Sequence, residues 1–258
     1  MDLQIKGLKA LVTAGAGGIG IEIARAFVRE GAKVHVCDVD DKALAALKDT
    51  DPALTWSRCD VADRAQVAAL FDVAIKNLGG LDCLVNNAGI AGPTGRIEEI
   101  NPEDWDRCIA VDLTSQFNCA RLAIPHLKNS KNASIMNLSS QAGKHGFPLR
   151  SPYAAAKWGV IGFTKSIAIE LGPFGIRVNA LLPGLVAGDR IRRVIEAKAQ
   201  QRGLAFKQQE DAMFAATSIK DYVTPQQLAD MVVFAASPRA KTISGQAISV
   251  CGDTNMLG

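Results

Sequence analysis

The sequence predicts an α/β fold in which a parallel, doubly wound sheet carries helices on both faces. Short apolar runs typical of buried strands alternate along the whole chain with longer segments of helical character. A glycine-rich loop follows the first apolar run and opens the first helix, as in a strand–loop–helix unit of such a sheet. The 258 residues suffice for one domain, residues 1–258, and neither a repeat nor a linker divides them.

Composition narrows the class of protein. Apolar residues make up 48% and charged residues 21%, as in a soluble globular protein, and no apolar run approaches the ~18 residues of a membrane span. The net charge of +3 argues against a broad surface for nucleic acid or for a membrane. Six scattered cysteines without a Cys-x-x-Cys pair predict free thiols and no metal site. Because no apolar leader is evident either, we expect a cytoplasmic protein.

The first elements form a dinucleotide-binding unit. A strand is expected over residues 8–13, a helix over residues 21–29 and a second strand over residues 33–37. The glycines between the first strand and the helix allow the backbone to approach a diphosphate at the helix N-terminus. The loop residues expected to bind it are Gly15, Gly17, Gly18, Ile19 and Gly20.

Asp38 follows the second strand, 18 positions after Gly20, where a spacing of about 20 is expected for an acid that binds the adenosine ribose. Its carboxylate can accept hydrogen bonds from both ribose hydroxyls, and it would repel the ~−2 charge of a 2′-phosphate. Neither Val39 nor Asp40 supplies a compensating positive charge, so NAD is favoured over NADP. Alternatively, Asp38 or Asp40 caps a helix that extends through Lys48, and both roles can coexist.

The later elements continue the alternation. Further strands are expected over residues 54–59, 81–85, 133–138, 176–182 and 246–250. Further helices are expected over residues 63–78, 102–127, 153–171 and 225–236. Capping and breaking residues mark their ends, among them Asp63, Gly79, Gly172, Pro173, Pro183 and Gly184. The charged segment 186–222 has helical stretches and is expected to form a substrate lid.

The stretch from Ser140 to Lys157 carries the residues with catalytic chemistry. Pro152 can begin a helix, so Tyr153 and Lys157, four positions apart, share one helix face. A cation beside a phenol favours the phenolate, and a phenol tuned in this way can exchange a proton with an alcohol or a ketone. Ser140 follows an apolar run and can donate to the same oxygen. Alone, a Tyr-x-x-x-Lys pair is usually a surface pair. The surrounding motifs therefore decide whether this pair is catalytic.

Five motifs supply that context. They are the loop Thr13–Gly20, Asp60-Val61, Asn86-Asn87-Ala88-Gly89, Ser140 with Tyr153 and Lys157, and the segment Asn179–Gly184. With these motifs in this order and spacing, the sequence resembles the short-chain dehydrogenase/reductase family over essentially its whole length. The resemblance implies a Rossmann fold with a seven-stranded parallel sheet, NAD(P)-dependent oxidation of alcohols, and a homotetramer.

The resemblance also implies a role for each matching residue. Ser140 would position the substrate carbonyl, Tyr153 would be the acid–base, and Lys157 would favour the phenolate and hold the nicotinamide ribose. Asp60 and Val61 would contact adenine. The other residues expected to bind the cofactor are Asn87, Ala88, Gly89, Pro183, Gly184 and Val186.

Three positions depart from the family pattern. Ala14 replaces the first glycine of the loop. The loop tolerates its methyl group if φ of Ala14 is negative, and we expect a negative φ there. Asp112 stands where the family has a catalytic Asn, and its backbone carbonyl is expected to keep the relay role of that residue. Gly188 replaces a Thr that helps to hold the carboxamide. Together they raise a second hypothesis, a NAD-binding sensor or scaffold with little turnover, against which the intact serine, tyrosine and lysine argue.

The charges near the expected site favour a small anionic substrate, such as a hydroxy acid, a keto acid or a sugar acid. Arg150 lies three residues before Tyr153, and in the 3-hydroxybutyrate dehydrogenases of this family a Lys at that offset holds the substrate carboxylate. A guanidinium can do so with two hydrogen bonds. The basic lid residues are Arg190, Arg192, Arg193, Lys198, Arg202 and Lys207, and the acidic ones are Asp189, Glu196, Glu210 and Asp211.

Alternatives to this substrate remain open. Most lid charges can belong to a solvated helix face, and Arg150 can pair with a neighbouring acid. Within the family the alternative substrate is a 3-oxoacyl thioester, whose acidic carrier could use the same basic surface. The preference for NAD argues against that substrate, because biosynthetic reductases more often use NADPH.

Overall fold

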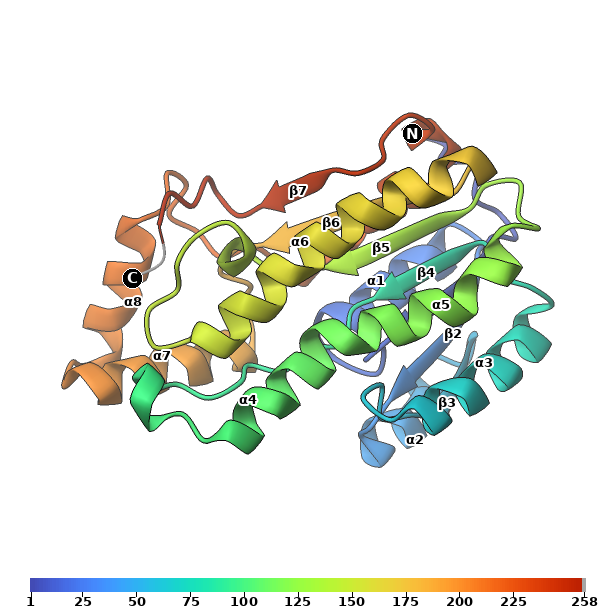
Figure 1. Ribbon diagram of the computed structural model, residues 1–258. Coiled ribbons are helices and arrows are strands. Elements are labelled where there is room, and N and C mark those ends of the chain that lie inside the picture. Colours follow the sequence, from blue (N-terminus) through green and yellow to red (C-terminus); the bar gives the residue numbers. More distant parts are fainter. Residues whose placement is uncertain (257–258) are drawn as a thin grey trace.

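The computed structural model describes residues 1–256. Their strands form one seven-stranded sheet (Figure 1). All neighbouring strands are parallel, and their order is β3-β2-β1-β4-β5-β6-β7. The strands are β1 (Lys9–Thr13), β2 (Lys33–Asp38), β3 (Leu54–Arg58), β4 (Cys83–Asn86), β5 (Ser134–Leu138), β6 (Arg177–Pro183) and β7 (Ala247–Val250). The order reverses at β1, which pairs with both β2 and β4, so the predicted doubly wound sheet is confirmed.

Helices cover both faces of this sheet (Figure 1). One apolar core lies under α1 (Gly18–Arg29), α2 (Asp41–Thr50) and α9 (Pro225–Ala236). The other lies under α3 (Arg64–Leu78), α5 (Ser115–Leu127) and α6 (Ser151–Leu171). Strand residues alternate between the two cores: Ala10 and Val12 join the first, whereas Leu11 joins the second. Because the sheet is buried on both faces, its strands appear in the sequence as continuous apolar runs.

Helix boundaries follow the capping residues of the sequence. Asp63 caps α3 by accepting hydrogen bonds from two backbone N–H groups, and Gly79 ends it with a φ of 72°. Asp40 caps α2, so of the two candidate caps Asp38 is left for another role. α1 begins at Gly18, three residues before the expected start, because the glycine loop itself forms the first turn.

The helix expected over residues 102–127 is interrupted. A π-helical turn, Ala110–Thr114, joins α4 (Pro102–Ile109) to α5. Such turns are rare and often occur at functional positions. Asp112 lies in the middle of this one, so the irregular turn coincides with a position where the chain departs from the family pattern.

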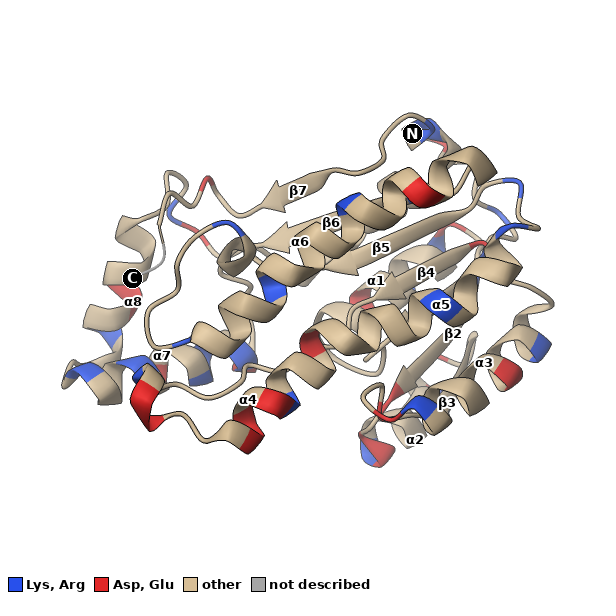
Figure 2. Ribbon diagram, viewed as in Figure 1, with Lys and Arg blue, Asp and Glu red and all other residues tan. Residues whose placement is uncertain are grey.

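The segment 186–222 forms two helices at one end of the sheet, α7 (Asp189–Arg202) and α8 (Phe206–Ala215) (Figure 1). Three buried side chains form their small core: Leu185, Ile195 and Met213. Basic residues lie along α7 (Figure 2). Among residues 1–256, no helix is both long enough and apolar enough to span a bilayer.

Candidate active site

The glycine loop exposes the N-terminus of α1. Gly17 is the N-cap of this helix and no side chain caps it, so N–H groups of the first turn lack a side-chain acceptor. A Cβ on Gly17 would meet nothing within 4 Å, whereas a Cβ on Gly20 would lie 2.0 Å from the carbonyl oxygen of Ala14. Gly20 therefore permits close packing of helix and loop, and Gly17 leaves open space. A free helix N-terminus beside open space fits the diphosphate of a dinucleotide.

Ala14 does not have the negative φ that we expected. Its φ is 49°, in the left-handed region that costs a residue with a Cβ about 1–2 kcal/mol. Neighbouring groups hold this conformation: Asn87 Nδ2 donates at 3.0 Å to the carbonyl oxygens of both Thr13 and Ala14. Thr13 Oγ1 in turn accepts the N–H groups of Asn87 and Ala88, each at 3.0 Å. These bonds fasten the turn after β4 to the glycine loop.

The carboxylate of Asp38 lies at the mouth of the same loop. Its Oδ2 accepts the N–H of Ala16 at 3.2 Å, and its Oδ1 accepts the N–H of Val39 at 2.8 Å. Arg58, the neighbour of Asp38 on β3, forms an ion pair with Asp41 at 3.4 Å instead. Oδ1 also accepts the N–H of Asp40 at 3.2 Å, so of the roughly four acceptor sites of a carboxylate about one remains for a ribose hydroxyl.

The other residues expected to bind the cofactor lie where parallel strands end, the edge at which such sheets bind ligands. Asp60 and Val61 follow β3, residues 87–89 follow β4, and residues 183–186 follow or end β6. Asp60 is already engaged, since Arg107 Nη2 lies 2.9 Å from its Oδ2. The structure thus brings these residues to one edge of the sheet.

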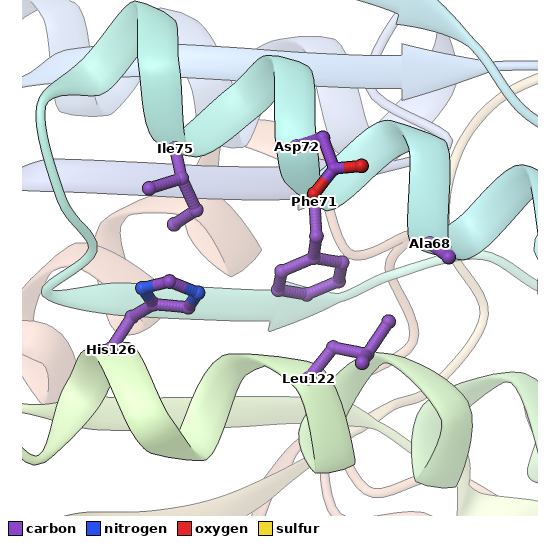
Figure 3. Close-up of a pocket in the computed structure, with 6 residues that line it drawn as sticks. All are labelled: Ala68, Phe71, Asp72, Ile75, Leu122 and His126. Carbon is purple, nitrogen blue, oxygen red and sulfur yellow. The ribbon is translucent and has the colours of Figure 1, made fainter.

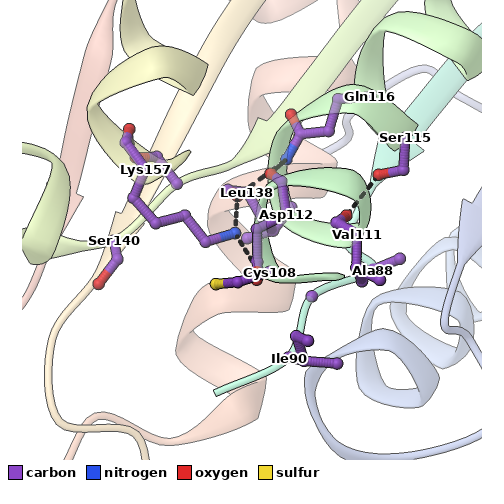
Figure 4. Close-up of polar contacts among 12 residues, drawn as sticks. Ala88, Ile90, Cys108, Val111, Asp112, Ser115, Gln116, Leu138, Ser140 and Lys157 are labelled. Atoms are coloured by element: carbon purple, nitrogen blue, oxygen red, sulfur yellow. Dashed lines mark hydrogen bonds and ion pairs between the residues drawn. The ribbon is translucent and has the colours of Figure 1, made fainter. Parts of the chain in front are cut away.

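Lys157 and Asp112 form a buried ion pair. Lys157 Nζ lies 3.0 Å from Asp112 Oδ1 and donates at 3.0 Å to the carbonyl oxygen of Leu138 (Figure 4). The two side chains are 3% and 0% exposed. The same Nζ lies 5.5 Å from the centre of the Tyr153 ring. The ammonium therefore stands beside the phenol, as the spacing of four predicted, and a carboxylate offsets part of its charge.

Two further residues surround Asp112 that the sequence analysis missed. The Cys108 thiol donates to Asp112 Oδ2 at 3.5 Å, and burial together with this carboxylate raises the pKa of the thiol to about 12. Gln116 Nε2 donates at 3.3 Å to the backbone carbonyl of Asp112, which was expected to serve the relay (Figure 4). Both lie four positions from Asp112, so the helical spacing was a usable signal.

We expect Asp112→Asn to keep most of the wild-type activity, because the amide fits the same space and the backbone carbonyl is unchanged. Loss of the negative charge should strengthen the field of Lys157 and shift the pH–rate profile to lower pH. Initial rates measured across the neutral and alkaline range would show this shift. An inactive Asn variant would mean that the carboxylate itself moves a proton.

Ser140 and Tyr153 occupy the ends of adjacent elements. Ser140 follows β5, and its Oγ accepts the N–H of Ala142 at 3.1 Å. Tyr153 lies in the first turn of α6, which begins at Ser151 with Pro152 in that turn, as expected. Figure 4 shows Ser140 and Lys157 on the same side of the cluster that it draws.

Arg150 is the N-cap residue of α6 and is only 2% exposed. Its guanidinium carbon lies 5.2 Å from the centre of the Tyr153 ring and 5.3 Å from that of Phe147. Nη2 donates to the carbonyl oxygen of Ala91, whereas Nε and Nη1 have no hydrogen-bond partner. Burial lowers the pKa of the guanidinium. Within residues 1–256 no acid forms an ion pair with Arg150, so the alternative of an acidic partner is wrong for the described chain.

Lys198 is one of the basic lid residues, most of which could alternatively have formed a solvated helix face, but it is fully buried on α7. Its Nζ lies 4.1 Å from the centre of the Phe147 ring. Burial, and then the nearby charges of Arg202 and Arg150, lower its pKa to about 7. Arg192, in contrast, is exposed and belongs to the solvated face of α7.

Gly188 is the N-cap of α7 and has a φ of 137°, a conformation that L side chains rarely adopt. The family's Thr would be strained in this backbone. Two residues later, Arg190 Nη1 and Nη2 donate to the carbonyl oxygens of Gly89 and Ile90 at 3.0 and 2.9 Å. The guanidinium carbon of Arg190 lies 5.8 Å from the centre of the Tyr153 ring. The departure at Gly188 therefore accompanies an arginine that reaches the ring of Tyr153.

A separate hollow of about 280 Å³ lies between α3 and α5 (Figure 3). Its lining residues are Ala68, Phe71, Asp72, Ile75, Leu122 and His126. None of the residues expected to bind cofactor or substrate lines it. The hollow is therefore separate from the candidate site at the strand ends.

Known proteins resemble the chain over nearly its full length. Residues 14–253 match the family model described as enoyl-(acyl carrier protein) reductase. D-beta-hydroxybutyrate dehydrogenase from Cupriavidus necator is 35% identical, over 94% of this chain and 95% of that protein. Cis-4-hydroxycyclohexanecarboxylate dehydrogenase from Sinomonas cyclohexanicum is 37% identical, over 94% of each.

A solved structure of a variant of actinorhodin polyketide ketoreductase with NADPH is also similar. It superposes with a TM-score of 0.88 at 34% identity, over 94% of this chain and 95% of that one. Its likeness agrees with the seven-stranded parallel sheet. The chain belongs to the short-chain dehydrogenase/reductase family, whose members are nicotinamide-dependent oxidoreductases acting on CH–OH groups.

Proposed function

We propose that the protein is a NAD-dependent dehydrogenase that interconverts the secondary alcohol and ketone forms of a small organic acid. The observation that carries the substrate class is Arg150, a buried guanidinium beside Tyr153 with two unpartnered nitrogens. A buried charge without a partner is strongly unfavourable. A substrate carboxylate would supply that partner through a two-pronged hydrogen bond. Two similar proteins are, by name, dehydrogenases of hydroxy acids.

The residues at the strand ends have distinct parts in this reaction. Ser140 would donate a hydrogen bond to the substrate oxygen, and Tyr153 would take the proton from it during oxidation or return it during reduction. Lys157 favours the phenolate by its charge and lies within the same cluster. The nicotinamide cofactor, when bound along the glycine loop, supplies the acceptor for the hydride of the carbinol carbon.

Replacement of Arg150 tests the substrate class. We expect Arg150→Met to lower kcat/KM for an acid by roughly 10- to 100-fold, the value of a charge-assisted hydrogen bond. The methyl ester or amide of the same acid should react equally in both proteins, and Arg150→Lys should recover part of the loss. If neutral analogues react as well as acids and the Met variant loses nothing, the acid is not the substrate.

A 3-oxoacyl thioester is the second candidate substrate, because a similar solved structure is a polyketide ketoreductase. A panel of hydroxy acids, sugar acids, neutral secondary alcohols and acyl thioesters, each assayed with both cofactors, would separate the two. Preference for a thioester with NADPH would support this candidate. Tight NADH binding without turnover of any compound would favour the sensor hypothesis.

The choice of NAD depends on Asp38. Its carboxylate stands at the loop mouth, where it would accept a ribose hydroxyl and repel a 2′-phosphate. We expect Asp38→Asn to lower the ratio of kcat/KM for NAD to that for NADP by about tenfold. Asp40→Asn is the matched control, because Asp40 caps α2, and it should leave the ratio unchanged. A wild-type protein that prefers NADP would contradict the ribose argument.

The expected homotetramer is likewise a proposal. The outer faces of α5 and α6 leave large apolar side chains exposed, including Phe117, Trp158 and Ile169. Contiguous exposed apolar surface commonly marks an interface between protein chains. Light scattering coupled to size-exclusion chromatography would give the mass in solution. We also propose a cytoplasmic location, which the six free cysteines support.

A further inference from the structure

We propose that Arg190 is a second anion-binding residue, carried on α7, which exchanges two backbone carbonyl oxygens for the anionic group of the substrate. This inference rests on the proposed function, because it requires an acidic substrate. It deepens that function by assigning a specificity-determining residue outside the catalytic elements. It also gives the segment 186–222 a defined contact through which to respond to the substrate.

The geometry places two guanidinium groups at the same phenol. Their carbon atoms lie 5.2 Å, for Arg150, and 5.8 Å, for Arg190, from the centre of the Tyr153 ring. A substrate oxygen that exchanges a proton with Tyr153 must come within hydrogen-bond distance of its hydroxyl. A carboxylate a few bonds away would then lie near the ring to which both guanidiniums are adjacent.

The charges of this region are unbalanced. Asp112 faces Lys157, with which it is paired, and the neighbouring Cys108 thiol is held protonated by burial. In the described chain neither Arg150 nor Arg190 forms an ion pair with an acid. After burial, repulsion by Arg190 is a cause of the lowered pKa of Arg150. An anion between the two guanidiniums would replace this repulsion with attraction.

The present partners of Arg190 can be exchanged. They are the neutral carbonyl oxygens of Gly89 and Ile90. A hydrogen bond to an ionised acceptor is roughly twice as strong as one to a neutral acceptor, so a carboxylate would compete well. The Arg190 side chain is exposed, and Gly188 before it has a φ of 137° with no atom near a Cβ position. The guanidinium of Arg190 therefore lies at an exposed helix start, with no atom close to the Cβ position of Gly188.

Arg190→Met, assayed beside Arg192→Met, tests the inference. Arg192 lies on the exposed face of the same helix and pairs with Glu196, so it controls for loss of a positive charge from α7. With saturating NAD, we expect Arg190→Met to raise KM for an acid about tenfold, with kcat changed less than KM. The amide of that acid should react as in the wild type, and Arg190→Lys should recover part of the affinity. Arg192→Met should change neither constant by more than about twofold.

Hydrogen exchange gives a second readout. With NADH and a non-reacting acid bound, we expect slower amide exchange in the first turns of α7 in the wild type, and no such protection in Arg190→Met. Equal KM values for the acid in Arg190→Met and wild type, with Arg150→Met impaired, would overturn this inference alone. Full activity of both variants on acids would overturn the proposed function as well. Equal losses for acid and amide, at an unchanged melting temperature, would show that Arg190 only fastens α7 to the turn after β4.

Discussion

Tyr153→Phe is expected to abolish turnover while the variant still binds NADH. The substitution removes only the hydroxyl, and loss of a positioned acid–base typically lowers the rate 10²- to 10⁴-fold. The ring that packs beside the guanidiniums of Arg150 and Arg190 remains, so the site should keep its shape. Single-turnover absorbance of NADH would measure hydride transfer, and NADH fluorescence would measure binding.

The other tyrosine of the chain provides a matched control. Tyr222 also carries a phenol, but its hydroxyl donates to Glu210 and its ring packs on Phe214, within the segment 186–222. Tyr222→Phe should therefore keep turnover within a few-fold of the wild type. Near wild-type turnover by Tyr153→Phe would refute the proposed mechanism.

Of the substitutions considered, Lys157→Met is expected to lower the free energy of unfolding the most. It leaves the Asp112 carboxylate fully buried without its cation, and breaking a buried ion pair in this way costs about 3–5 kcal/mol. We expect the free energy of unfolding in urea to fall by about that amount. Turnover should be lost too, because no ammonium then stands beside the Tyr153 phenol.

A second substitution separates these two effects. Lys157→Met combined with Asp112→Asn removes both charges, so most of the lost stability should return while turnover stays absent. The difference between the double variant and the two single variants measures the coupling of the pair. A double variant as unstable as Lys157→Met would show that the lysine stabilises the fold through the carbonyl of Leu138 and through packing instead.

Local geometry explains what the sequence predicted well. The helix cap at Asp63 and the shared face of Tyr153 and Lys157 depend on residues within one or two turns, and both occur as expected. Such features can be derived from spacing because no distant segment decides them.

Contacts between segments distant in the chain explain the features that the sequence did not predict. The φ of Ala14 is stabilised by Asn87, 73 positions away, and no local pattern reports that contact. The burial of Arg150 and Lys198 depends on the tertiary structure, because a lid lysine such as Lys198 could equally have belonged to a solvated helix face. From the sequence, Gly188 indicated only the loss of a threonine hydroxyl. Its φ of 137° shows that the backbone there has a conformation that favours glycine.

The packing of α9 against α1 bears on how the chain folds during synthesis. Both helices cover the same face of the sheet, and buried side chains such as Ile23 and Phe27 share one core with Leu228 and Val232. Roughly 200 residues separate the helices, which the ribosome needs about 10 to 40 s to translate. For that time the apolar face of the nascent nucleotide-binding half lacks its cover. Nascent chains that end before residue 225 should therefore be chaperone clients and prone to aggregate.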